Sequence, residues 1–176
     1  MEDYYLRALE PSDYKEIFRW RSDPTSSAAV AGQSRVISEE IEREWVLSQI
    51  KKHAGGEILR FVICEIEGSK PVGLWSVSDF DFVNRTCFSS GVLIAPEERG
   101  KKIMSKARKL VFDYLFYELN MQKIKGSALV INDASIKNIE RSGYVKEGVL
   151  RREVYKHGEY HDLVLYGILK EEYEER

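Results

Sequence analysis

Strand-like and helix-like segments follow one another along this chain in an order that few folds accommodate. From the N-terminus the order is strand, two helices, three strands, helix, strand, helix and two strands. The expected strands cover residues 4–9, 59–66, 72–80, 87–94, 124–131, 144–155 and 160–169. This order predicts an α/β (α+β) fold, in which a mixed, mostly antiparallel sheet of about seven strands carries helices on both faces.

Polar side chains mark where the helices are expected to begin. Ser12 is expected to cap the first helix and Ser38 the second, because a hydroxyl can accept a hydrogen bond from the first turn. A long third helix should begin near Gly100, and Asp133 should cap the fourth. The apolar face of the second helix is expected to be formed by Ile41, Trp45 and Ile50.

The size and charge of the chain are those of one globular domain. Its 176 residues fit a single domain, 1–176, that can bury a core without disulfides or a metal ion. A net charge of −2 argues against nucleic acid or a membrane as the main partner. Cys64 and Cys87 lie in apolar runs and are expected to be small buried residues. Because neither a signal peptide nor a long apolar run is visible, a cytoplasmic location is expected.

Two segments in which a strand leads into a helix are candidate binding sites. In the first, 92–105, backbone N–H groups at the helix start and the adjacent lysines could bind phosphate, although a solvated basic helix face is an equally good interpretation. In the second, Asn132 to Ser135 follow an apolar strand, where ligands of α/β sheets tend to bind. Simple helix capping by Asn132 or Asp133 is the alternative there.

Together these segments resemble the GNAT superfamily of N-acetyltransferases. The first motif of that family, [QR]-x-x-G-x-[GA], is matched at Arg99, whereas Lys102 stands at the usual glycine and Met104 at the usual small residue. The second motif resembles Asn132-x-x-Ser135. Further likeness to the RimJ/RimL-like branch, which acetylates ribosomal-protein alanine, is found at residues 6–9, 103–107, 142–144, 147–151 and 158–162. The resemblance covers nearly the whole chain.

The resemblance implies an enzyme that uses acetyl-CoA as co-substrate, without a metal. The pyrophosphate would lie at the helix start, and the pantetheine amides would pair with the preceding strand as an extra strand, which requires the strands ending at Ile94 and Ile131 to part. The implied cofactor-binding residues are Val92, Leu93, Ile94, Arg99, Gly100, Lys101, Lys102, Ile103, Met104, Ser105 and Asn132. Many relatives carry a tyrosine acid at the position of Ile139. Ser135 is therefore the candidate catalytic residue, with capping as the alternative role.

The acceptor is expected to be a primary amine. An α-amine has a pKa of about 8 and lysine about 10.4, so at pH 7.5 about a quarter of α-amines are neutral, against about 0.1% of lysines. An α-amine thus needs less help from a base, for which Glu65, Asp79, Asp81 and Glu147 are candidates. The first expectation is a protein N-terminus and the second a small amine (polyamine, amino sugar or amino acid). A non-catalytic acyl-CoA-binding regulatory module is the alternative function, and a homodimer is left open.

Overall fold

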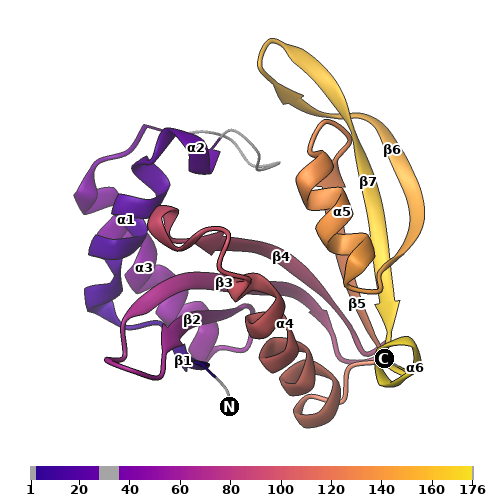
Figure 1. Ribbon diagram of the computed structural model, residues 1–176, viewed down its shortest axis with the longest axis horizontal. Coiled ribbons are helices and arrows are strands. Elements are labelled where there is room, and N and C mark those ends of the chain that lie inside the picture. Colours follow the sequence, from indigo (N-terminus) through magenta and orange to yellow (C-terminus); the bar gives the residue numbers. More distant parts are fainter. Residues whose placement is uncertain (1–2, 28–35, 176) are drawn as a thin grey trace.

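A single seven-stranded sheet organises the molecule (Figure 1). The structure, a computed structural model, describes residues 3–27 and 36–175. The strand order is β1-β2-β3-β4-β5-β7-β6; among the strand pairs of these described residues, β4–β5 is parallel and the other five are antiparallel. The strands are β1 (Tyr4–Ala8), β2 (Leu59–Glu65), β3 (Pro71–Asp81), β4 (Thr86–Ile94), β5 (Lys123–Leu129), β6 (Val145–Lys156) and β7 (Glu159–Leu169). The expected mixed, mostly antiparallel sheet is confirmed.

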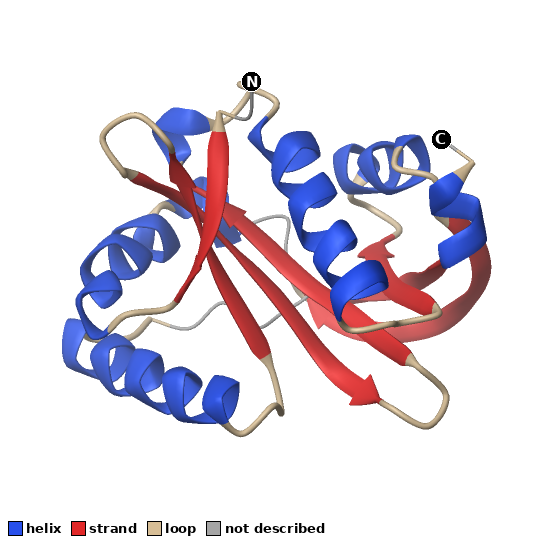
Figure 2. Cartoon of the chain, turned by 90° about the horizontal axis from the view of Figure 1, so that it is seen from below, coloured by secondary structure: helices blue, strands red, loops and turns tan. Residues whose placement is uncertain are grey.

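Helices cover both faces of the sheet, as expected (Figure 2). One face carries the N-terminal helices, and α4 and α5 pack on the other. Along β2 the side chains alternate: Phe61 and Ile63 point toward α4, whereas Val62 and Cys64 point toward α1 and α3. The helices are α1 (Tyr14–Ser22), α2 (Pro24–Ser27), α3 (Glu39–Ala54), α4 (Ile103–Asp113, extended by a π turn over Tyr114–Glu118), α5 (Asp133–Arg141) and α6 (Lys170–Glu174).

Three expected helix starts differ from the structure. Residues Pro11–Asp13 form a 3-10 turn before α1, and the carboxylate of Asp13, not the hydroxyl of Ser12, accepts the N–H of Glu10 at 2.8 Å. The α4 helix begins at Ile103, three residues after Gly100, because Gly100 and Lys102 both have positive φ angles. Asn132, not Asp133, caps α5. The Ser38 cap is confirmed, since its hydroxyl accepts the N–H of Ile41.

The buried face of α3 also differs from the expected one. Ile41 is 52% exposed, and the residues of α3 that are buried are Glu42, Val46 and Gln49. Two of these are polar and keep partners under the surface: Glu42 binds Arg21 at 2.8 Å, and Gln49 accepts from Arg60 at 3.1 Å. Arg21 also stacks on Trp45, 3.8 Å from the ring centre. Because arginines from neighbouring elements pair with these side chains, polar residues occupy positions that a hydrophobic pattern assigns to solvent.

Both cysteines are buried and free, as expected. Burial raises the pKa of Cys87 to about 12, so its thiol is unreactive at neutral pH. Within residues 3–27 and 36–175, no helix is both long enough and apolar enough to cross a membrane.

Candidate active site

The strands β4 and β5 stay paired over a short stretch only. Their parallel ladder joins Thr86 to Lys123, Cys87 to Ile124 and Phe88 to Lys125, and in the described chain it ends there. Beyond Phe88 the two strands diverge, as Figure 1 shows, and one edge of β4, from Ser89 to Ile94, has no strand partner in the part of the chain that the structure describes. We call this unpaired edge of β4, together with the diverging end of β5, the slot. It has the form that the resemblance requires.

A β-bulge lies at the inner end of the slot and was not anticipated from the sequence. Ser76 is opposite Gly91 and Val77 is opposite Ser89, so Ser90 is an extra residue in β4. Gly91 follows with a φ of +153°, which residues with a Cβ rarely adopt. The signal for the bulge was this glycine inside an otherwise regular strand.

The backbone of β4 divides its hydrogen-bonding groups between β3 and the slot. Ala95 N–H donates to the carbonyl of Val72 at 2.9 Å. Since bonded pairs alternate along an antiparallel ladder, Leu93 also pairs with β3, whereas Val92 and Ile94 turn their N–H and C=O groups toward the slot. Gly73 allows this close pairing, because a Cβ there would lie 2.8 Å from the carbonyl oxygen of Leu93. Of Val92, Leu93 and Ile94, which the resemblance implies for cofactor binding, two therefore turn their backbone groups toward the slot.

The loop before α4 exposes N–H groups at the start of a helix. Gly100 has a φ of +85° and Lys102 a φ of +60°, which turn the chain sharply into α4. The N–H of Ser105 already donates to the carbonyl of Lys102 at 3.2 Å, and its hydroxyl does so at 2.8 Å. The N–H groups of Ile103 and Met104 have no acceptor among the described residues, as is usual in a first helical turn.

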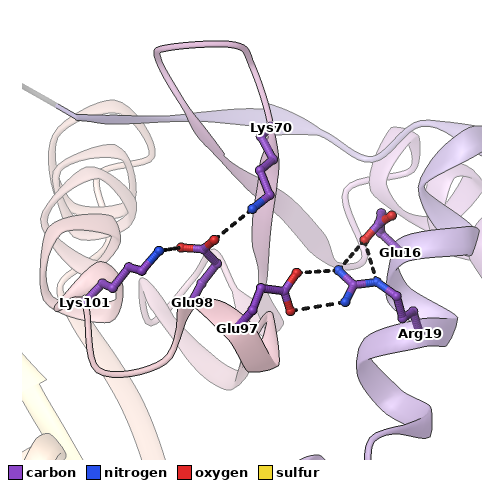
Figure 3. A network of polar contacts seen from close by, with 6 residues as sticks. All are labelled: Glu16, Arg19, Lys70, Glu97, Glu98 and Lys101. Atoms are coloured by element: carbon purple, nitrogen blue, oxygen red, sulfur yellow. Dashed lines mark hydrogen bonds and ion pairs between the residues drawn. The ribbon is translucent and has the colours of Figure 1, made fainter.

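An ion-pair network fixes the turn that leads into this loop (Figure 3). Glu98 is buried and binds Lys70 at 2.8 Å and Lys101 at 2.7 Å. Its neighbour Glu97 binds Arg19 of α1 at 2.7 Å, and Arg19 also binds Glu16. Lys101 is thus held by a carboxylate, whereas Lys102 is exposed and has no ion-pair partner among the described residues. Of the two lysines, Lys102 has the charge available for a ligand.

Arg99 is directed to α2. Its guanidinium donates to the hydroxyls of Thr25 and Ser26 and lies 3.7 Å from the carboxylate of Asp23. These contacts tie the end of α1 and the start of α2 to the loop before α4. The motif residue that matched the family pattern best therefore joins two segments 74 residues apart in the chain.

At the start of α5, the N–H and the hydroxyl of Ser135 have different surroundings. Asn132 accepts the N–H of Ser135 at 3.0 Å, so the amide of Asn132 performs the capping. The hydroxyl of Ser135 makes no hydrogen bond to a described residue. One turn further on, Asn138 contacts the sulfur of Met104 at 2.7 Å and so links α5 to α4. Ile139 packs against the core.

The four carboxylates that the sequence offers as candidate bases lie in different surroundings. Asp81 accepts the N–H groups of Val83 and Asn84, which lowers its pKa. Glu147 binds Lys123 at 2.5 Å. The remaining two are Glu65, near the Lys70–Lys101 end of the network, and Asp79, which is exposed and accepts from Ser78 at 3.3 Å.

Comparison with known sequences identifies the family. The model of the acetyltransferase (GNAT) domain matches residues 4–145. YokL, an uncharacterized prophage-derived N-acetyltransferase of Bacillus subtilis, is 32% identical over 132 residues, which are 75% of this chain and 71% of YokL. The spermidine N(1)-acetyltransferase of Vibrio cholerae is 26% identical over 168 residues, 96% of this chain and 94% of that protein.

Solved structures share the fold over the same length. Spermidine N-acetyltransferase from Vibrio cholerae, in complex with CoA and spermine, has a TM-score of 0.85 at 25% identity and covers 98% of this chain and 99% of its own. The ribosomal-protein-S5-alanine acetyltransferase from Vibrio fischeri has a TM-score of 0.83 at 23% identity, with 98% and 96% covered. This chain therefore belongs to the GNAT family and is an acetyl-CoA-dependent N-acetyltransferase.

Proposed function

We propose that the slot and the start of α4 bind acetyl-CoA and that the acetyl group passes to a protein N-terminal α-amine. The observation that carries the first half is the parting of β4 and β5 after Phe88, next to the loop that leads into α4. An unpaired strand edge suits an extended arm containing amides, and a free helix start suits phosphate. The residues present thus fit both parts of acetyl-CoA.

The phosphate end of the proposed site is the turn into α4. Backbone N–H groups of Gly100, Lys101, Lys102, Ile103 and Met104 would bind the pyrophosphate, with Ser105 at the margin because its own N–H is engaged. The positive end of the helix dipole adds to this attraction. Lys102 would supply mobile positive charge. Arg99 would act indirectly, by holding the loop against α2.

The arm of acetyl-CoA would lie along β4. Val92 and Ile94 would exchange hydrogen bonds with its amides, and Leu93 would support them through its pairing with β3. The co-substrate supplies an activated acyl group. A slot-facing N–H of β4 would stabilise negative charge on the acyl oxygen during transfer, an effect typically worth about 3 kcal/mol.

On the opposite side of the slot, Asn132 and Ser135 have separate proposed roles. Asn132 holds the first turn of α5 in place through its bond to the Ser135 N–H. The hydroxyl of Ser135 would then hydrogen-bond the departing sulfur, directly or through water. A thiol has a pKa near 8.5, so the sulfur leaves readily and the help required is modest.

The acceptor is proposed from the surroundings of the carboxylates. Asp81 and Glu147 are engaged elsewhere, and residues 28–35, outside the described part, contain no Asp or Glu. Glu65 and Asp79 stay candidates for the base. An amine that is already partly neutral makes the smallest demand on any base, and an α-amine fulfils this far better than a lysine. Small amines are the second candidate, because similar proteins include spermidine acetyltransferases.

An acceptor panel tests this proposal. Three substrates are compared at equal concentration with acetyl-CoA: a peptide with a free N-terminal alanine and no lysine, the N-acetylated form of a lysine-containing peptide, and spermidine. Thiol release gives the rate, and mass mapping gives the modified nitrogen. The α-amine peptide should have the highest kcat/KM. Turnover of spermidine alone, or modification of lysine only, would reject a protein N-terminus as the acceptor.

A further inference from the structure

We propose that Tyr144 closes the inner end of the slot and thereby limits the length of the acyl group that the enzyme accepts. The inference rests on the proposed acyl-CoA site and adds to it the residue that sets acyl selectivity. Tyr144 directly precedes β6 and is only 9% exposed.

The position of Tyr144 coincides with the point where the strands part. The β4–β5 ladder pairs Thr86 with Lys123, then Cys87 with Ile124, then Phe88 with Lys125. In the same register the next pair would be Ser89 with Gly126. The ring of Tyr144 lies against Gly126, and the side chain of Ser89 is close enough to act on its phenol. Its side chain therefore occupies the first place at which strand pairing fails.

The tyrosine ring packs directly over Gly126 of β5. A Cβ on Gly126 would be in van der Waals contact with the ring, 3.4 Å from Cε1 of Tyr144 and 3.9 Å from its hydroxyl oxygen. The ring is braced on the α4 side by the edge of Phe112, whose ring centre is 5.8 Å away. A ring held between β5 and α4 acts as a wedge, because β4 cannot close on β5 without displacing it.

Ser89 links this region to β3, because its hydroxyl oxygen accepts the indole N–H of Trp75 at 3.0 Å. The side chain of Ser89 is also close enough to Tyr144 to act on the pKa of the phenol. Burial raises the pKa of Tyr144, against the opposing effect of Arg108, so the phenol remains neutral. Trp75, Ser89 and Tyr144 form a fixed floor.

The floor lies opposite the phosphate end of the slot. The loop into α4 leaves β4 at Ile94, whereas Ser89 is five residues earlier, about 17 Å away along an extended strand. An arm that begins at the start of α4 and follows β4 brings its acyl end toward Ser89 and Tyr144. An acetyl group would meet this floor, and each added methylene would press against the ring.

Binding of acyl-CoA homologues, without any acceptor, tests the inference. Dissociation constants of acetyl-, propionyl- and butyryl-CoA are measured by calorimetry for the unmodified chain and for Tyr144→Phe, Tyr144→Leu and Tyr144→Met. The unmodified chain should prefer acetyl over propionyl by roughly tenfold. Tyr144→Phe keeps the ring and should keep that ratio within twofold. Tyr144→Leu, and Tyr144→Met if leucine does not fold, should reduce the preference to threefold or less.

A matched control separates selectivity from loss of stability. Phe116 is fully buried in the same hydrophobic cluster but lies on the extension of α4, and Phe116→Leu should lower stability without changing the acetyl/propionyl ratio. Equal ratios in the unmodified chain and the folded leucine or methionine variant would overturn the inference, as would a changed ratio in Phe116→Leu. No acceptor enters the measurement, so an incorrect assignment of the α-amine leaves this result unaffected.

Discussion

At the scale of single residues, enzyme kinetics can test whether the hydroxyl of Ser135 assists the departing sulfur. Asn132 already caps the first turn of α5, so removal of the Ser135 hydroxyl should leave the helix intact. We expect Ser135→Ala to lower kcat roughly tenfold, with little change in KM for acetyl-CoA, because the lost bond forms mainly in the transition state. Asn132→Ala is the contrasting variant and should cost about 1 kcal/mol of stability. Full kcat at saturation in Ser135→Ala would exclude the proposed role.

Lys102 combines an unfavourable backbone conformation with an available charge. A φ of +60° in a residue with a side chain costs of order 1 kcal/mol, which glycine avoids. Lys102→Gly should therefore raise the melting temperature by about 1–3 °C while raising KM for acetyl-CoA about threefold. Lys101→Gly is the control, because Lys101 has no positive φ and is bound to Glu98. A lower melting temperature in Lys102→Gly would contradict the strain argument.

At the scale of elements, the contact between α1 and the turn before α4 should respond to acid. The hydrogen bond from Arg19 lowers the pKa of Glu97 from 4.5 to about 2. A lowered carboxylate pKa contributes stability above pH 4.5, and this contribution is lost as the pH falls toward 2. Glu97→Gln should therefore melt about 1–3 °C below the unmodified chain at pH 7, and the gap should narrow below pH 4.5.

The control for this measurement is Glu40→Gln. Glu40 pairs with Arg43 inside a single helix, so its loss separates no elements, and its melting curves should follow those of the unmodified chain from pH 7 to 3. A Glu97→Gln gap that is independent of pH would show that the Arg19 contact stabilises the fold by packing and not by charge.

The ends of helices and the turns between strands were predictable where neighbouring residues in the sequence determine them. Ser38 caps α3 as its hydroxyl and the following glutamates indicate, and the glycine at 158 turns the β6–β7 hairpin with a φ of +87°. The buried face of α3 was not predictable in this way. Its burial depends on Arg21 and Arg60, which come from other elements and whose pairing with Glu42 and Gln49 has no local signal.

At the scale of the whole molecule, the loop before α4 depends on local sequence, whereas the slot depends on residues from distant segments. The turn at 99–105 carries a motif within a few residues, so the sequence located the start of α4 to within three residues, from Gly100 to Ile103. The inner end of the slot is made by Trp75 of β3, Ser89 of β4 and Tyr144 before β6. These residues are each ordinary in their segments, and only the strand order β3-β4-β5-β7-β6 brings them together.

Binding of acetyl-CoA should stabilise the whole chain. A ligand that binds only the folded state adds about 2.7 kcal/mol at 100 times its Kd, which for a domain of this size raises the melting temperature by several degrees. The effect should depend on Gly100, whose φ of +85° lets the loop present its N–H groups.

Two substitutions at Gly100 separate backbone conformation from charge. Gly100→Ala and Gly100→Asp both place a Cβ at a positive φ, so both should lower the melting temperature without ligand. Only aspartate adds a negative charge beside the phosphates. The acetyl-CoA shift should therefore shrink in the alanine variant and vanish in the aspartate variant, with part of it restored by salt because exposed charges are screened. A full shift in Gly100→Asp would place the phosphates elsewhere. An absent shift in the unmodified chain at millimolar acetyl-CoA would remove the basis for a binding site at the start of α4.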